Sequence, residues 1–269
     1  MTSFLGQCPS LEFIKLSLPF PPQPRTPPPR ESVRLNALNQ LDCNQTASTC
    51  GLLDQLILPK CEVMVLNGWF TDEAFDQDGR PAARIHPSSI DHLPVTGGNM
   101  RAVAMPSSCV LSGPNGCLRF CFFRGYRDNF DARFFTSLYP IPVSEIRELL
   151  VGTQAKYSGG TRKPWKQSAD RVCGAFEMLK KVEDLTIVNC EAGPFFAALG
   201  STADGIIIHS DLRRLKIYVG RGHLDIPALT QCAEARFENS RPLGEVTIVF
   251  ENQPGAGVAL EMESLKEFR

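Results

Sequence analysis

A short unit of the form L-x-x-L-x-L recurs along the chain, and this repetition constrains the fold more than any other feature of the sequence. Successive copies in the C-terminal half begin about 30 to 36 residues apart, which leaves room for a strand, a helix and two connections. The pattern therefore predicts parallel strands joined by crossover helices. The apolar positions of these copies are Ile146, Leu149 and Val151; Val182, Leu185 and Ile187; Leu212, Leu215 and Ile217; and Leu243, Val246 and Ile248.

The segments between these copies carry helix signals. Pro164 precedes a stretch, 165–181, whose apolar residues recur with the 3.6-residue period of a helix. Asp225 can cap a second helix that begins near Pro227 and continues through Ala233 and Phe237. Each predicted helix leads directly into the next predicted strand.

A strand followed by one helix cannot bury its apolar face alone, so such units must stack on one another. We therefore predict an α/β fold of the irregular leucine-rich-repeat type, a solenoid with a curved parallel sheet on its concave side and helices and loops on its convex side. The array is expected to span 1–269 as a single domain. A proline-rich loop at 19–30 and an irregular insertion at 67–99 interrupt it.

Earlier copies of the unit are weaker. Gly113-Pro114-Asn115-Gly116 is a turn signal between two apolar runs, so residues 100–123 form either two repeats or an inserted hairpin. The apolar positions of the weaker copies are Leu11, Ile14 and Leu16; Leu38, Leu41 and Cys43; Cys61, Met64 and Leu66; Met100, Val103 and Met105; and Leu118, Cys121 and Phe123.

Composition limits the partners and the location of the protein. A net charge of -1 argues against binding to nucleic acid or to an anionic membrane, because both need a clustered positive surface. The N-terminus lacks the basic region of a signal peptide, and no apolar stretch is long enough to cross a bilayer. Ten cysteines without framework spacing suit reduced thiols, so we predict a cytoplasmic or nuclear protein.

The sequence contains no recognisable catalytic or metal-binding constellation. Asp76-Gln77-Asp78-Gly79 resembles the opening of a calcium loop, but Pro87 stands where a bidentate glutamate is required. Gly220-Arg221-Gly222 lacks the third glycine of a dinucleotide fingerprint. We therefore predict no cofactor, no metal and no enzymatic activity. The alternative is an enzyme of unknown type that uses the acids and imidazoles of loop 72–92.

Residues that alternate with the apolar strand positions point to the concave side of the sheet. Exposed aromatic and arginine side chains are typical of protein-binding surfaces, so we expect a protein-binding patch there. The charged residues Glu148, Asp184, Arg214 and Glu245 would form a cross-strand ladder even without a ligand, and both interpretations remain open. The candidate partner-binding residues are Phe120, Phe122, Arg124, Arg214, Lys216 and Tyr218.

Several stretches of the C-terminal half resemble the repeat region of fungal F-box leucine-rich-repeat proteins. They are the segment 182–190, the segment 194–200 and the Leu-Arg-Arg-Leu-Lys-Ile of 212–217. In that family the repeats choose the substrate of a ubiquitin ligase, and the F-box binds the ligase through an adaptor protein. The resemblance thus implies a non-catalytic recognition scaffold. No F-box precedes Leu11, so adaptor binding is not expected, and the alternative is a truncated repeat remnant without independent function.

The two ends of the array are expected to differ. Few charged residues precede Arg25, so we expect an incomplete array with an exposed apolar patch around Phe4, Leu5, Leu11 and Phe13. At the other end, 260–269 alternates charged and apolar residues and is expected to protect the final repeat.

Overall fold

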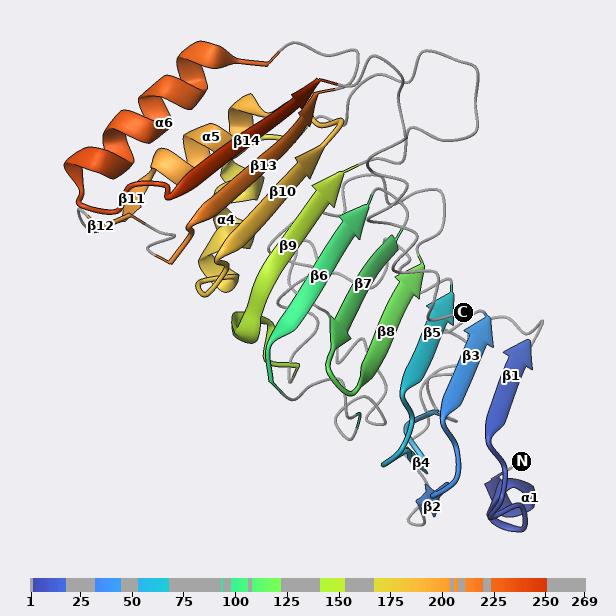
Figure 1. Ribbon diagram of the computed structural model, residues 1–269. Coiled ribbons are helices and arrows are strands. Elements are labelled where there is room, and N and C mark those ends of the chain that lie inside the picture. Colours follow the sequence, from blue (N-terminus) through green and yellow to red (C-terminus); the bar gives the residue numbers. More distant parts are fainter. Residues whose placement is uncertain are drawn as a thin grey trace, which may run out of the picture. The chain divides into compact units, whose positions relative to one another are not determined.

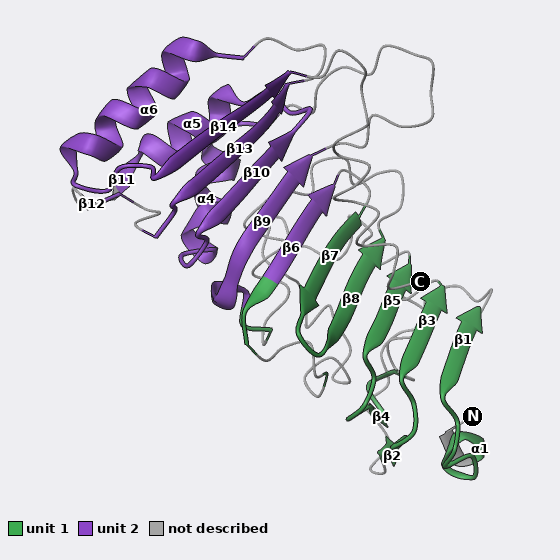
Figure 2. Ribbon diagram, viewed as in Figure 1, with its two compact units in different colours: residues 1–100, 107–127, 136–142 green, residues 101–106, 128–135, 143–269 purple. Residues whose placement is uncertain are grey.

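The chain is an α/β protein with a large, mostly parallel sheet of ten strands, as the computed structural model shows (Figure 1). The predicted α/β class and the mostly parallel sheet are therefore confirmed. The chain divides into two compact units, residues 1–100, 107–127 and 136–142, and residues 101–106, 128–135 and 143–269 (Figure 2). The structure describes residues 2–17, 32–44, 53–67, 93, 98–105, 108–121, 141–152, 167–203, 206–207, 211–219 and 224–250. Most of the two predicted interruptions, 19–30 and 67–99, therefore lies outside the described residues.

The first unit contains five strands of the sheet in the order β1-β3-β5-β8-β7. The first four are parallel neighbours, and β7 is antiparallel to β8. Two short strands, β2 (Val33–Arg34) and β4 (Leu56–Ile57), pair separately. The other elements are α1 (Thr2–Gly6), β1 (Phe13–Ser17), β3 (Gln40–Asn44), β5 (Val63–Asn67), β7 (Ser108–Gly113) and β8 (Gly116–Cys121).

Two in-register rows of buried side chains form the core beneath these strands. They confirm the predicted apolar positions of the copies that begin at Leu11, Leu38 and Cys61. Strand alternation explains the rows, because every second side chain points to the same side of the sheet. One row is Ile14, Leu41, Met64 and Leu118, and the other is Leu16, Cys43, Leu66 and Phe120.

The segment 108–121 is a hairpin rather than two repeats. Its strands pair in antiparallel fashion around a turn at Pro114 and Asn115. Gly116 follows the turn with a φ of +150°, and a Cβ there would lie 2.3 Å from the Glu62 carbonyl oxygen, so only glycine fits without a shift. The hairpin also corrects the predicted register of β8. Leu118 and Phe120 point into the core, whereas the sequence pattern placed Cys121 there. In this strand the first position of the L-x-x-L-x-L unit is Asn115, a polar residue in the turn, so the search for apolar residues gave the wrong register.

The second unit contains the strands β6-β9-β10-β13-β14, in that order. The pairs β9–β10, β10–β13 and β13–β14 are parallel, and the helices α4, α5 and α6 lie along one face of these strands (Figure 1). The elements are β6 (Met100–Met105), the 3-10 turn η4 (Val143–Glu145), β9 (Ile146–Gly152), α4 (Ala169–Met178), β10 (Asp184–Val188), α5 (Gly193–Gly200), β11 (Thr202–Ala203), β12 (Ile206–Ile207), β13 (Arg214–Val219), α6 (Ile226–Glu238) and β14 (Glu245–Phe250).

The predicted core positions of β9, β10 and β13 are confirmed, whereas Val246 at the equivalent position of β14 is 42% exposed, which corrects its predicted burial. Leu185, Ile187, Leu215 and Ile217 are almost completely buried, and β10 and β13 pair in parallel with Leu185 opposite Leu215. Asp225 caps α6 by accepting a hydrogen bond from the backbone N–H of Ala228 at 3.0 Å.

Local details of the helices differ from the prediction. Helix α4 begins at Ala169, four residues later than expected, because Ser168 provides the N-cap. In α6 the buried residues are Cys232 and Arg236, whereas Phe237 is 73% exposed. The two guanidinium NH2 nitrogens of Arg236 donate to the carbonyl oxygens of Leu199 and Leu212 at 3.3 and 3.2 Å. Because both acceptors are buried, the side of α6 that carries Arg236 faces the interior, and Phe237 is turned toward solvent.

Two further expectations can be compared with the described residues. None of the helices among them is long and apolar enough to span a membrane. At the N-terminal end Phe4 and Phe13 are exposed and Leu11 is partly exposed, but Leu5 is buried. Three of the four side chains predicted to be exposed are therefore at least partly exposed, and Leu5 is not.

Candidate functional site

The side of the strands of the second unit that faces away from the helices carries polar side chains. Because side chains alternate along a strand, the residues between the buried leucines all project to this side. They form two in-register rows across neighbouring strands, which we call the polar face. The first row is Glu148, Asp184, Arg214 and Glu245, and the second is Thr186, Lys216 and Thr247.

Opposite charges on the first row pair with one another. Arg214 donates through Nε and Nη2 to both carboxylate oxygens of Asp184, and Arg101 Nε lies 3.6 Å from Glu148 Oε2. Hydrogen bonding to Asp184, with the nearby charges of Glu245 and Glu148, raises the pKa of Arg214 above its usual range. The four residues of the predicted charge ladder are therefore in register across the strands, and within it Arg214 forms an ion pair with Asp184.

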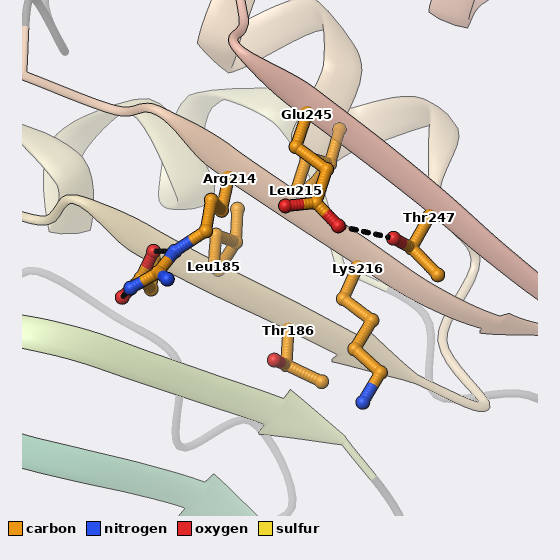
Figure 3. Close-up of a pocket in the computed structure, with 8 residues that line it drawn as sticks. Leu185, Thr186, Arg214, Leu215, Lys216, Glu245 and Thr247 are labelled. Carbon is orange, nitrogen blue, oxygen red and sulfur yellow. Dashed lines mark hydrogen bonds and ion pairs between the residues drawn. The ribbon is translucent and has the colours of Figure 1, made fainter.

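A shallow pocket of about 160 Å³ lies on the polar face between β10, β13 and β14 (Figure 3). The Thr247 hydroxyl faces Glu245 across its rim, with Oγ1 3.1 Å from Glu245 Oε1. Sites for drug-sized ligands usually measure about 300 to 1,000 Å³. The pocket is thus of a size to receive one side chain of a partner. It is lined by Asp184, Leu185, Thr186, Arg214, Leu215, Lys216, Glu245 and Thr247.

The polar face ends before the carboxyl ends of the strands. Tyr218 is only 7% exposed, so the prediction that its ring belongs to the exposed patch is wrong. Lys216 Nζ lies 4.9 Å from the centre of that ring, in a cation–π arrangement. Leu150 and Val188, which share this side of the sheet with Tyr218, are also buried. Strand alternation fixes the side to which a residue points but not what covers it.

The other predicted partner-binding residues differ in where the structure places them. Arg214 is exposed and Lys216 is partly exposed on the polar face, as predicted. Phe120 is completely buried in the core of the first unit, which corrects its expected place on the surface. Phe122 and Arg124 lie outside the described residues.

Sequence reasoning missed a polar cluster on the equivalent side of the first unit. The Asn67 side-chain amide donates to Asn44 Oδ1 at 2.8 Å and to Asp42 Oδ1 at 3.2 Å, and Lys15 lies 3.9 Å from the Asp42 carboxylate. The signal was present in the sequence, because these residues alternate with the buried positions of β1, β3 and β5.

Two observations on the described residues concern metal binding and thiol reactivity. They contain no group of three or more His, Cys, Asp or Glu side chains placed to hold a metal ion. Burial raises the pKa of the Cys117 thiol to about 11 and that of the Cys61 thiol to about 12, so both are protonated and weakly reactive at neutral pH. Loop 72–92, on which the enzyme alternative depends, lies outside the described residues.

Each unit thus presents polar side chains on one side of its strands and buries apolar rows on the other. This geometry defines a candidate surface but does not by itself assign a family. Comparison with models of known protein families, with curated proteins and with solved structures found no match to the chain.

Proposed function

We propose that the chain is an irregular leucine-rich-repeat solenoid that acts as a non-catalytic protein-recognition scaffold. The observation that carries this proposal is the polar face, where two in-register rows of charged and hydroxyl side chains lie on the side of the sheet away from α4, α5 and α6. The regular succession of strand and helix from β9 to β14 supports the repeat architecture.

The polar face suits a protein partner better than a small molecule. Adjacent strands lie about 4.8 Å apart, so each row offers hydrogen-bonding groups at regular intervals along an extended surface. The pocket between Thr186, Lys216 and Thr247 would receive one anchoring side chain of the partner. In a narrower form of the proposal, based on the resemblance to fungal F-box leucine-rich-repeat proteins, the partner is the substrate of a ubiquitin ligase.

A double substitution that changes the shape and the charge pattern of the pocket tests this function. The double variant Thr186→Arg and Lys216→Glu fills the pocket and exchanges the positive charge at position 216 for a negative one, without replacing a residue of the buried rows. Affinity purification from cells followed by mass spectrometry should recover the partner of the wild-type chain at least about tenfold less with this variant, a loss of roughly 1.4 kcal/mol or more in binding.

The matched control is Lys180→Glu, an exposed charge reversal at the end of α4 on the helical side of the unit. It should recover the partner as well as the wild type does. All three proteins should melt within a few degrees of one another. Equal recovery of the partner by the pocket variant and the control would contradict the proposal.

A further inference from the structure

The large apolar side chains that the second unit exposes gather on its last two elements, α6 and β14. Among the described residues of this unit, they are Ile226, Phe237, Val246 and Phe250. β14 is the last strand of the sheet, and α6 is the last helix of its layer, because α4 packs on α5 and α5 packs on α6 (Figure 1). The strand layer and the helix layer therefore end together, and the exposed apolar residues lie at that end.

The outer edge of β14 offers backbone groups to a further strand. The Glu245 N–H donates to the Arg213 carbonyl oxygen at 3.0 Å, so Glu245 turns its backbone toward β13. Backbone direction alternates along a strand, so Val246, Ile248 and Phe250 turn their N–H and C=O groups away from β13. No other strand among the described residues pairs with this edge. Residues 246–250 contain no charge and no proline, the usual means of blocking the pairing of an open edge with another chain.

Helix α6 carries an exposed, uncharged line of side chains, which we call the α6 stripe. Its members recur at intervals of four, three and four residues, so they lie along one line of the helix. They are Ile226, Thr230, Ala233 and Phe237. The buried Arg236 lies on a different side of the helix and donates to the Leu199 carbonyl oxygen of α5. The stripe is therefore not occupied by the contact between α5 and α6.

We propose that this end of the second unit is the interface of a homodimer with twofold symmetry. In the dimer, β14 pairs in antiparallel fashion with β14 of a second copy, and the two α6 stripes face each other. Twofold dimers are the commonest oligomers, and their interface uses one self-complementary surface twice. The proposal concerns a surface other than the polar face and does not depend on what binds there.

A second copy complements this surface residue by residue. If Ile248 lies opposite Ile248 of the second copy, Val246 lies opposite Phe250, and all of these residues turn their backbone groups toward the partner strand. Antiparallel α6 stripes likewise bring Ile226 to Phe237 of the second copy at both ends. Glu245 is the one charged residue of β14, and in this register the two copies place it at opposite ends of the paired strands. The interface thus joins apolar side chains and keeps like charges apart.

The exposed aromatic area is of the size that a dimer interface needs. At roughly 200 Å² for each phenylalanine, the exposed fractions of 73% for Phe237 and 66% for Phe250 leave about 280 Å² open in each copy. An interface of standard size buries about 800 Å² on each partner. The two rings therefore supply roughly a third of it, and the strand edge, Ile226 and Val246 add to this area.

Sedimentation velocity of the full chain over about 1 to 100 μM tests the inference, and we expect the wild type to form a dimer in this range. Val246→Lys and Phe250→Glu each place a charge opposite an apolar side chain at both ends of the paired strands. Each should raise the Kd of the dimer at least about tenfold. Phe237→Glu should do the same on α6 without altering a strand. All three side chains are exposed in the single chain, so the far-UV circular dichroism spectrum should stay that of the wild type.

The double variant Val246→Lys with Phe250→Glu tests the antiparallel register. It brings the new ammonium group of one copy opposite the new carboxylate of the other at both ends of the strands. The double variant should therefore dimerise at least about tenfold more tightly than either single variant. The matched control is Phe13→Glu, at an exposed phenylalanine of the edge strand β1, and it should leave the dimer unchanged.

A chain that stays monomeric over the whole concentration range would overturn the proposal. A dimer that resists Val246→Lys, Phe250→Glu and Phe237→Glu would place the interface elsewhere, and a double variant no tighter than the single variants would contradict the antiparallel pairing. Species that grow beyond a dimer and disappear with Phe13→Glu would indicate head-to-tail pairing of β14 with β1, which contradicts twofold symmetry.

Discussion

Leu215→Ala is expected to lower the free energy of unfolding by about 2 to 5 kcal/mol. Leu215 lies in the middle of the core row, between Leu185 and Val246 on the neighbouring strands, and is almost completely buried. Truncation removes the transfer free energy of the side chain and leaves a cavity that parallel strands held on both sides cannot readily close.

Urea denaturation of the full chain measures this loss. The control is Leu215→Met, which keeps the volume of the side chain and should cost less than about 1.5 kcal/mol. A loss below about 1 kcal/mol for the alanine variant would mean that Leu215 does not lie in a close-packed core.

Arg236→Leu is expected to destabilise the second unit by about 2 to 4 kcal/mol, because two buried carbonyl oxygens lose their donors at roughly 1 to 3 kcal/mol each. The guanidinium joins the last turn of α5, through the Leu199 carbonyl, to the segment before β13, through the Leu212 carbonyl. Its positive charge also lies at the C-terminal end of the α5 dipole, which stabilises it.

Burial of this charge acts in the opposite direction. Desolvation lowers the pKa of Arg236 below its usual range. Replacing arginine by leucine removes the desolvation penalty of the buried charge, and this gain offsets part of the stability that is lost with the two hydrogen bonds. We expect the hydrogen bonds to dominate, because leucine offers no donor to either carbonyl. Arg236→Lys, which keeps the charge but cannot reach both acceptors, should give an intermediate loss. A leucine variant as stable as the wild type in urea would show that desolvation outweighs the two hydrogen bonds.

The parts of the fold that follow from short-range rules could be predicted from the sequence. Asp225 and Pro227 mark the start of α6 because capping depends only on neighbouring residues. The register of β10 and β13 follows from the apolar pattern, because a slip of β13 by one residue would turn Leu215 and Ile217 away from the core side on which Leu185 lies.

The parts that depend on distant partners could not be predicted. Sequence reasoning placed Phe237 among the apolar residues of α6 and gave no role to Arg236, but carbonyls on α5 and before β13 turn the arginine inward. Tyr218 likewise points to the side of the sheet that alternation predicts, yet it is buried there. In both cases the decisive neighbour is far away in the sequence.

Site-specific photocrosslinking tests the central claim, that the polar face is the surface that binds a partner. A photoreactive amino acid is placed at Thr247 on the polar face or at Glu234, which is exposed on α6. We predict that one protein is crosslinked to the photoreactive residue at position 247 and not to the one at position 234. An excess of wild-type chain without the photoreactive residue should compete for this protein and reduce the crosslinked product, whereas an excess of the Thr186→Arg and Lys216→Glu variant should not. Capture of the same protein from both positions, or equal suppression by both competitors, would contradict the assignment of the polar face as the recognition surface.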